Sequence, residues 1–406
     1  MWVHAVLRPA AIAMGAGLLV SSAAVAHRRA PDAAPAARTS ARADSAVTAA
    51  LDAFIRHEMR QKQLPAFSIT LVDDQRVVWT KAYGVARFRD STPATDRTVY
   101  RVGSVSKLFT DIAIMQLVER GALDLDAPVS RYVPDVHPTN PFRTPITLRE
   151  LMAHRSGLER ETPAGSYFDD APPSLATTLH SLDATTLVYQ PGTHTKYSNA
   201  GIALVGYVLE RTQHQPFATY VQHAVLDKLG MTHSAFVRAP SLGGDVADAL
   251  MWSYDPRTFP APTFELGIAP AGSMYTTGPD LGRFLSALFA GGRGVNGRIL
   301  RKETLDAMWR PQFAKPGETT GFGLGFALST LDGHREIGQY FPNIDRELLP
   351  IQWPQVTRHD DQRARRQSVG AEVEQARLDR PRRSVGVYDI DVAIIGIAPV
   401  AACEFD

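Results

Sequence analysis

The sequence predicts an α/β (α+β) fold in which an antiparallel sheet is flanked by helices and carries an inserted all-helical domain. Residues 67–74 (FSITLVDD) and 76–84 (RVVWTKAYG) are two β-rich runs joined by a short polar turn, which is typical of an antiparallel hairpin. From residue 122 to about 285 the chain consists mostly of helical segments broken by Pro and Gly. A strand-like pattern resumes over 321–338 (GFGLGFALSTLDGHREIG). An insertion of helices into one sheet accounts for this order most economically.

Length and composition indicate an ordinary globular protein of about two domains. The chain has 406 residues, of which 44% are hydrophobic and 21% are charged, and its formal net charge is +1. This balance gives no electrostatic reason to expect nucleic acid or a membrane surface as a partner. Cys403 is the only cysteine, so an intrachain disulfide is excluded.

Residues 1–26 have the pattern of a signal peptide. Arg8 gives a positive start, residues 9–25 are apolar and small, and residues 24–26 (AVA) fit the small-x-small cleavage site. A membrane anchor is the competing interpretation, but the apolar run is short and rich in Ala, Gly and Ser. We therefore expect a periplasmic or secreted bacterial protein without a stable membrane span after cleavage. Residues 27–44 are predicted to be a disordered linker.

Segments 45–100 and 286–338 are assigned to a discontinuous sheet domain, and 101–285 to the mostly helical domain. The first predicted helix, 45–62, places five apolar residues on one face, namely Val47, Leu51, Phe54, Ile55 and Met59. Residues 339–406 form an atypical tail with nine arginines and no lysine, for which remnant sheet strands and disorder are the two interpretations.

The stretch 103–109 (GSVSKLF) places Ser104 three residues before Lys107. The structural interpretation is a serine helix cap followed by an ordinary lysine. However, residues 108–118 are apolar nearly all round, which predicts a buried helix with Lys107 one turn from Ser104 on the same side. Burial and the positive helix terminus both disfavour the charged form of this lysine. A neutral Lys107 amine would take the proton of Ser104, which would then act as a nucleophile.

A second polar element lies in residues 191–201 (PGTHTKYSNAG), before a new apolar helix. The structural interpretation is a turn with an Asn helix cap. The chemical interpretation is that the Tyr197 phenol shuttles protons, while Asn199 holds a substrate amide or ester carbonyl. His194 and Lys196 are predicted to be structural or to face solvent.

Six blocks between about residues 45 and 338 carry a family resemblance. In order, they are LPAFSITLVDD, TVYRVGSVSKLFTDIAIMQLVERGALDLDAPVSRYVPD, ITLRELMAHRSGL, PGTHTKYSNAGIALVGYVLERT, LDKLGMTHSAF and PAGSMYTTGPDLGRFL. With S-x-x-K and Y-x-N in this order, the chain resembles the superfamily of class C β-lactamases, D-alanyl-D-alanine carboxypeptidases and related esterases. The resemblance implies a β-lactamase/transpeptidase-like fold. It also implies Ser104 as the acylated nucleophile, Lys107 and Tyr197 as the proton-transfer pair, and Asn199 as a substrate-positioning residue.

The same resemblance implies a small-molecule or cell-wall peptide substrate containing an amide, a β-lactam or an ester. It implies no metal and no organic cofactor, and the chain contains no H-E-x-x-H, no Cys/His cluster and no Walker loop. The glycines of GFGLGF lack a following helix, so we interpret them as part of a strand rather than a nucleotide loop.

The sequence departs from the family at its third motif. A K-[ST]-G or H-[GS]-G element is expected after the Gly-rich strand, but residues 339–341 read Gln-Tyr-Phe. In the family this element supplies one oxyanion donor, and loss of such a donor lowers the rate by roughly a hundred- to a thousandfold. A non-catalytic or decayed member that binds cell-wall or related ligands is therefore the alternative function. The arginine-rich tail suggests a frameshifted or recombined 3′ end, which reading the nucleotide sequence in all frames tests.

Overall fold

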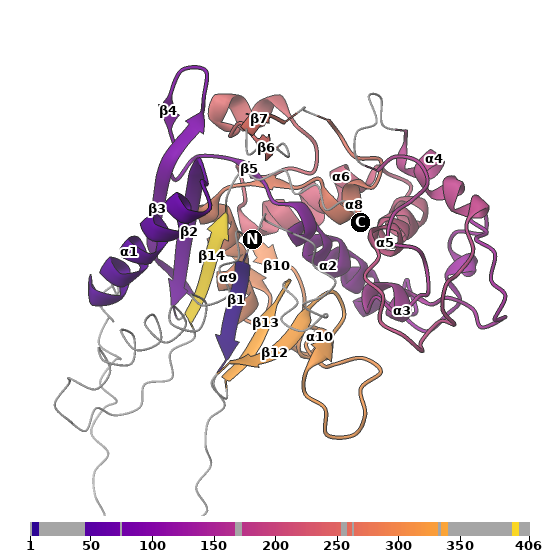
Figure 1. Cartoon of the computed structure of the whole chain (residues 1–406). Coiled ribbons are helices and arrows are strands. Elements are labelled where there is room, and N and C mark those ends of the chain that lie inside the picture. The colour runs from indigo at the N-terminus through magenta and orange to yellow at the C-terminus, as the bar shows by residue number, and fades with distance from the viewer. Residues whose placement is uncertain are drawn as a thin grey trace, which may run out of the picture. The chain divides into compact units, whose positions relative to one another are not determined.

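The structure is a computed structural model, and it describes residues 2–7, 45–73, 75–166, 173–252, 258–261, 264–331, 334–339 and 392–397. These residues all fall within one unit, formed by Met1–Tyr340 together with Ile390–Ala401. Its main sheet has eight strands in the order β11-β12-β13-β1-β14-β2-β3-β4 (Figure 1). All neighbouring strands in this sheet are antiparallel, as predicted.

The predicted hairpin is formed by β2 (Ala66–Asp73) and β3 (Arg76–Arg87), which β4 (Thr92–Pro93) extends. Helix α1 (Ser45–Gln61) lies against one face of the hairpin, where Ile55 packs in a cluster with Ile69. Two members of the predicted apolar face, Val47 and Phe54, are 49% and 55% exposed. The buried face of α1 is therefore narrower than the periodicity predicts.

Helix α9 (Gly278–Phe289) covers the opposite face of the same hairpin (Figure 1). Side chains alternate along a strand, so Thr70 points away from α1 and toward α9. A Cβ placed on Gly282 would lie 2.8 Å from a methyl of Val77 and 2.9 Å from the methyl of Thr70, and this helix therefore approaches the sheet closely. The sequence-based boundary at residue 285 falls within this helix.

Strand β1 (Trp2–Leu7) lies between β13 (His334–Gly338) and β14 (Val392–Ile397). This differs from the expectation that residues 1–26 stand outside the fold. The segment WVHAVL is rich in valine and contains an aromatic residue, which suits a strand flanked on both sides. In addition, β14 pairs with β2, so 392–397 supply a sheet strand within the atypical tail. The predicted linker and the rest of the signal peptide and tail lie outside the described residues.

The Gly-rich run forms β11 (Gly321–Phe322) and leads into β12 (Ala327–Leu331), which pairs with β13. Of GFGLGF, only Gly321 and Phe322 lie in a strand, and residues 323–326 connect β11 to β12. Strand β13 ends at Gly338 and Gln339 follows it, at the position where the family motif is expected. Tyr340 and Phe341 lie outside the described residues.

The remaining elements build the helical region and its edges. The helices are α2 (Ser106–Glu119), α3 (Leu148–Met152), α4 (Leu175–His180), α5 (Asn199–Gln213), α6 (Phe217–Val221), α7 (Asp227–Leu229), α8 (Ala269–Gly272) and α10 (Lys302–Met308). Short helical turns are η1 (Gly103–Val105), η2 (Val129–Arg131), η3 (Ser181–Ala184), η4 (Gln222–Leu226) and η5 (Pro240–Asp245). Two-stranded pairs are formed by β5 (Tyr100–Arg101) with β8 (Tyr275–Thr276), β6 (Leu250–Trp252) with β7 (Thr258–Pro260), and β9 (Arg293–Gly294) with β10 (Gly297–Arg298).

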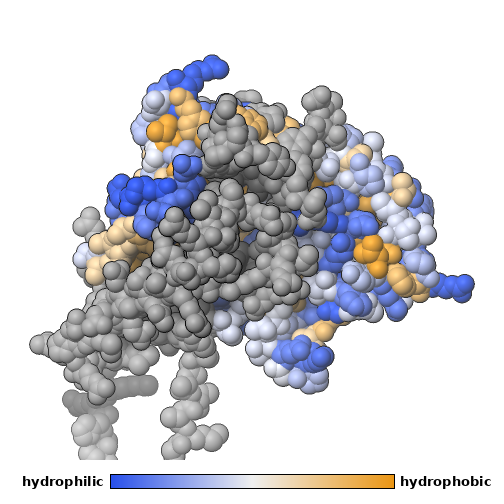
Figure 2. Space-filling view, viewed as in Figure 1, coloured by the Kyte–Doolittle hydropathy of each residue, from blue (hydrophilic) through white to orange (hydrophobic). Residues whose placement is uncertain are grey.

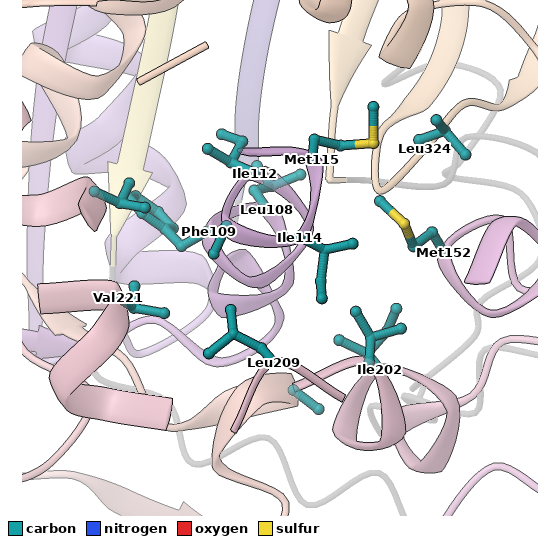
Figure 3. Close-up of a cluster of buried hydrophobic side chains, with 14 of the residues drawn as sticks. Leu108, Phe109, Ile112, Ile114, Met115, Met152, Ile202, Leu209, Val221 and Leu324 are labelled. Carbon is teal, nitrogen blue, oxygen red and sulfur yellow. The ribbon is translucent and has the colours of Figure 1, made fainter. Parts of the chain in front are cut away.

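Helix α2 is the centre of the core, as its all-round apolar sequence predicts. Every residue from Ser106 to Leu117 is buried. Figure 3 shows its side chains meeting neighbours from several other elements, among them Met152, Ile202, Leu209, Val221 and Leu324. Packing on all sides fixes the position of the helix, and with it the position of Ser104 and Lys107.

On the side shown in Figure 2, the coloured residues mix hydrophilic and hydrophobic groups over short distances. Across the described ranges, no helix combines the length and the apolar character needed to cross a membrane.

Candidate active site

Ser104 does not cap a helix. It lies in η1, and α2 begins at Ser106 without a side-chain cap. The side chain of Ser106 stabilises η1 and fixes it to a neighbouring segment. Its Oγ donates to the carbonyl of Gly103 (2.5 Å) and accepts the N–H of Met274 (3.0 Å). Ser104 Oγ lies 2.9 Å from Lys107 Nζ and 2.7 Å from the hydroxyl of Tyr197. The structural interpretation of Ser104 as a cap is therefore wrong.

Lys107 is 1% exposed, and it is held by groups from two other elements. Its Nζ donates to Ser104 Oγ and to the carbonyl of Ala271 (2.7 Å) in α8, and lies 4.9 Å from the ring centroid of Tyr197. Because Ser104 Oγ contacts both an amine and a phenol, its proton has two possible acceptors within hydrogen-bond distance. The predicted trio of Ser104, Lys107 and Tyr197 is therefore brought together by the fold.

Tyr197 rests on a buried histidine that the sequence reasoning did not select. The His154 ring lies against the Tyr197 ring, with centroids 4.5 Å apart and planes inclined by 31°, and its Nδ1 accepts the N–H of Ser198 (3.2 Å). The His154 carbonyl accepts the N–H of Lys196 (2.8 Å). Burial, assisted by the nearby Lys107, lowers the pKa of His154 to about 3, so the ring is neutral at physiological pH. His154 lies in the block LMAHRSGL, and that family block was the only available signal.

Asn199 is the first residue of α5 but does not cap it. The cap is Ser198, whose Oγ accepts the N–H of Gly201 (2.9 Å). The amide of Asn199 donates from Nδ2 to Glu161 Oε1 at 2.6 Å, and its backbone N–H donates to the carbonyl of Arg160 (2.7 Å). Asn199 is only 3% exposed, so its position two residues after Tyr197 is closely constrained.

Arg160 and Glu161 form a charged pair beside this site, which the sequence reasoning also missed. The Arg160 guanidinium lies 5.5 Å from the ring centroid of Tyr197 and 3.3 Å from Glu161 Oε1. Burial raises the pKa of Glu161, and this effect is opposed by the hydrogen bond from Asn199 and by the charges of Arg160 and Lys107. No residue pattern marks these two positions; only the folded chain brings them to Asn199.

Asp111 is a buried carboxyl one helical turn after Lys107. It is fully buried, and neither of its oxygens has a hydrogen-bond partner. Burial raises its pKa well above the ordinary value, although the charge of Lys107 opposes the shift. Gly325, with φ +80°, approaches so closely that a Cβ at this position would overlap the Asp111 carboxyl. Asp111 is therefore protonated and neutral over a range in which an exposed aspartate is ionised.

The other polar residues of the loop stand away from Ser104. His194 is exposed and stacks on Tyr189 with ring centroids 4.6 Å apart, and Lys196 is half-buried. Within the described part of the chain, no group of three or more His, Cys, Asp or Glu residues is placed to hold a metal ion.

A serine, a lysine and a tyrosine held together beside an antiparallel sheet and a helical region are the arrangement that the resemblance to serine β-lactamases implies. The Beta-lactamase family model matches residues 51–345, and the chain belongs to this family. Beta-lactamase-like protein 2 of Dictyostelium discoideum is 31% identical over 293 residues, covering 68% of this chain and 51% of that protein. The chain spans about half the length of the curated relatives it matches.

Two solved structures show the same fold. The octameric penicillin-binding protein homologue from Pyrococcus abyssi is 28% identical, with a TM-score of 0.63, over 71% of this chain and 67% of that one. The D-alanine carboxypeptidase AmpC from Burkholderia cenocepacia is 27% identical, with a TM-score of 0.56, over 71% of this chain and 75% of that one. The family and fold predicted from the six sequence blocks are thereby confirmed.

Proposed function

We propose that the protein is an exported serine hydrolase that forms an acyl-enzyme at Ser104. The observation that carries this proposal is the position of Ser104 Oγ, within 2.9 Å of Lys107 Nζ and 2.7 Å of the Tyr197 hydroxyl. Acyl transfer by a serine requires a general base in contact with its hydroxyl, and Ser104 has two candidates for that role. Its substrates are small molecules or cell-wall peptides that contain an amide, a β-lactam or an ester.

In acylation, Ser104 Oγ forms a bond to the substrate carbonyl carbon, and its proton passes to Lys107 or Tyr197. The bond from that carbon to the leaving nitrogen or oxygen then breaks, and the leaving group receives the proton. Water attacks the resulting ester, gives up a proton by the same route in reverse, and restores the Ser104 hydroxyl. Negative charge at the carbonyl oxygen develops beside the N-terminal end of η1 and α2, where the helix dipole stabilises it.

A labelling experiment tests the nucleophile. Wild type and Ser104→Ala are incubated with a fluorophosphonate and with a fluorescent penicillin, and bound label is measured on denatured protein. Ser130→Ala, which changes an exposed serine of η2, is the matched control. We expect label on wild type and on Ser130→Ala and none on Ser104→Ala. Absence of Ser104-dependent label with both probes would remove the proposed function for this chain.

A ligand-binding protein without turnover is the second candidate, and one observation favours it. Gln339 follows β13 at the position where the family carries its third motif. Thermal stabilisation by a cell-wall peptide that is recovered intact, in a protein that takes no label, would favour this function over the hydrolase.

A further inference from the structure

His154 lies just after the end of helix α3, in a backbone conformation that favours glycine. Its φ is +54°, and its N–H donates to the carbonyl of Leu151 (3.1 Å). The N–H of Arg155 donates in turn to the carbonyl of Glu150 (2.7 Å). This pair of bonds is the Schellman motif, whose left-handed position is usually glycine because a Cβ is disfavoured there. The chain therefore keeps a large side chain where its backbone favours none, which indicates a role for that side chain.

His154 contacts three consecutive residues, of which Tyr197 is the middle one. Its carbonyl accepts the N–H of Lys196 (2.8 Å), and its ring Nδ1 accepts the N–H of Ser198 (3.2 Å). The imidazole itself lies against the Tyr197 ring, with the centroids 4.5 Å apart. One residue therefore binds the backbone on both sides of Tyr197 and packs on its side chain as well.

The imidazole of His154 is fixed in turn by its surroundings. Phe322 of β11 lies edge-on to it, with ring centroids 5.2 Å apart and planes inclined by 81°, and His154 is only 3% exposed. Contacts from two segments and close packing leave this ring little freedom to turn. The Tyr197 hydroxyl, 2.7 Å from Ser104 Oγ, belongs to a ring whose position these contacts determine.

The hydrogen bond to Ser198 requires a neutral imidazole. A backbone N–H only donates, so Nδ1 carries no proton and the single ring proton of the neutral form is on Nε2. Burial, assisted by the charge of Lys107, lowers the pKa of His154 to about 3 and so keeps the ring in this form. An imidazolium would turn an N–H toward the N–H of Ser198, and the bond would be lost.

We propose that His154 is a positioning residue that holds the Tyr197 phenol in contact with Ser104. It acts through Tyr197 and not on the substrate itself, by fixing the backbone before and after that residue and by packing on its ring. The inference rests on the proposed function, because the position of the phenol affects the rate only if the Ser104 proton is transferred. A displacement of about 1 Å in such a contact can slow a reaction by about a hundredfold.

A double-variant cycle separates a role through Tyr197 from a general structural effect. The rate of Ser104 labelling by a fluorophosphonate is measured for wild type, His154→Asn, Tyr197→Phe and the double variant. Asparagine tolerates a positive φ and keeps an acceptor near the position of Nδ1, but it has no aromatic ring. We expect His154→Asn to slow labelling by about ten- to a hundredfold in wild type, and by less than about twofold in the Tyr197→Phe background, where no phenol remains to be positioned. The same change at an exposed histidine of the adjoining loop, His194→Asn, should leave the rate unchanged.

NMR on the wild-type protein tests the same contact without any substitution. With ¹⁵N-labelled histidine, the ring nitrogens of His154 are assigned through their contacts with the Tyr197 ring. We expect Nδ1 to stay unprotonated from pH 8 to pH 5, a range in which histidines of ordinary pKa become charged. A protonated His154 ring at pH 6, or an equal effect of His154→Asn with and without the Tyr197 hydroxyl, would overturn the proposal. If wild type takes no label at Ser104, the hydrolase function itself fails, and the NMR signals show separately whether His154 still holds Tyr197.

Discussion

Two lysines stand near Tyr197, and only Lys107 contacts Ser104. Replacing Lys107 with Met removes a proton acceptor while keeping most of the side-chain volume. We expect the rate of Ser104 labelling by a fluorophosphonate to fall by about a hundred- to ten-thousandfold. Lys196→Met is the control. The backbone N–H of Lys196 donates to the His154 carbonyl, and a change of side chain leaves this bond in place. Comparable losses in both variants would contradict the role of Lys107.

Asp111, a buried carboxyl in α2, makes the free energy of unfolding depend on pH. Its pKa is raised in the folded protein above the ordinary value of 3.8, so the unfolded chain releases this proton first. The resulting contribution to stability is complete below pH 3.8 and is lost as the pH rises through the folded-state pKa. Asp111→Asn removes this titration, so the variant should become progressively more stable than wild type from pH 4 upward, by at most about 1.4 kcal/mol per pH unit. Urea unfolding at several pH values measures this; parallel curves for the two proteins would refute it.

From sequence alone, a site residue can be predicted when its partner lies in the same short motif. Lys107 is three residues after Ser104, so helix geometry alone predicts their contact. Tyr197 required the family resemblance, because 93 residues separate it from Ser104. Glu161 lies outside the six family blocks, and His154 lies inside one of them without belonging to either motif; the contacts of both residues are with different segments of the chain. The structural alternative places the cap of α5 at Asn199, whereas the cap is Ser198, a difference of one residue that is typical of helix boundaries.

The contact of α9 with the sheet depends on one small residue at its centre. In Gly282→Ala, the added methyl would lie 2.8 Å from Val77 and 2.9 Å from Thr70, both β-branched and therefore stiff. We expect a loss of about 1 to 3 kcal/mol in the free energy of unfolding, the usual range for overpacking. The double variant Gly282→Ala/Val77→Ala should lose less stability than the sum of the two single variants, because Val77→Ala removes the methyl that the new side chain at position 282 would contact. Strict additivity of the two single changes would exclude this contact as the cause.

Local patterns predicted the elements more reliably than their edges and partners. The hairpin of β2 and β3 follows from two β-rich runs and a short turn, and α2 follows from an apolar run closed by Gly121, whose φ is +69°. The place of β14 beside β2 was not predictable, because more than 300 residues separate the two strands and alternation alone does not name a partner. The exposure of Val47 and Phe54 was not predictable either, because the periodicity of a helix does not say how much of its apolar face a neighbour covers.

At the level of the whole chain, residues 2–7 have two incompatible roles. The proposed export removes them with the signal peptide, whereas in the structure they form strand β1 of the sheet. Cleavage after Ala26 would remove β1, which separates β13 from β14. The mass of the exported protein should correspond to a chain that begins at residue 27. A mass that includes residues 1–26 would refute cleavage.

The effect of Ala5→Pro on the free energy of unfolding distinguishes the full chain, which contains β1, from the chain cleaved after Ala26, which lacks it. Ala5 is paired on both sides, opposite Ile337 and opposite Ala393, and proline removes a ladder donor from such a central strand. In the full chain produced without export, we expect a loss of about 2 to 3 kcal/mol in the free energy of unfolding. In the exported and cleaved protein the same substitution should have no effect, because the altered residue is absent. Ala11→Pro, four residues beyond the end of β1, is the control. An unchanged melting temperature in full-length Ala5→Pro would show that β1 does not belong to the stable sheet.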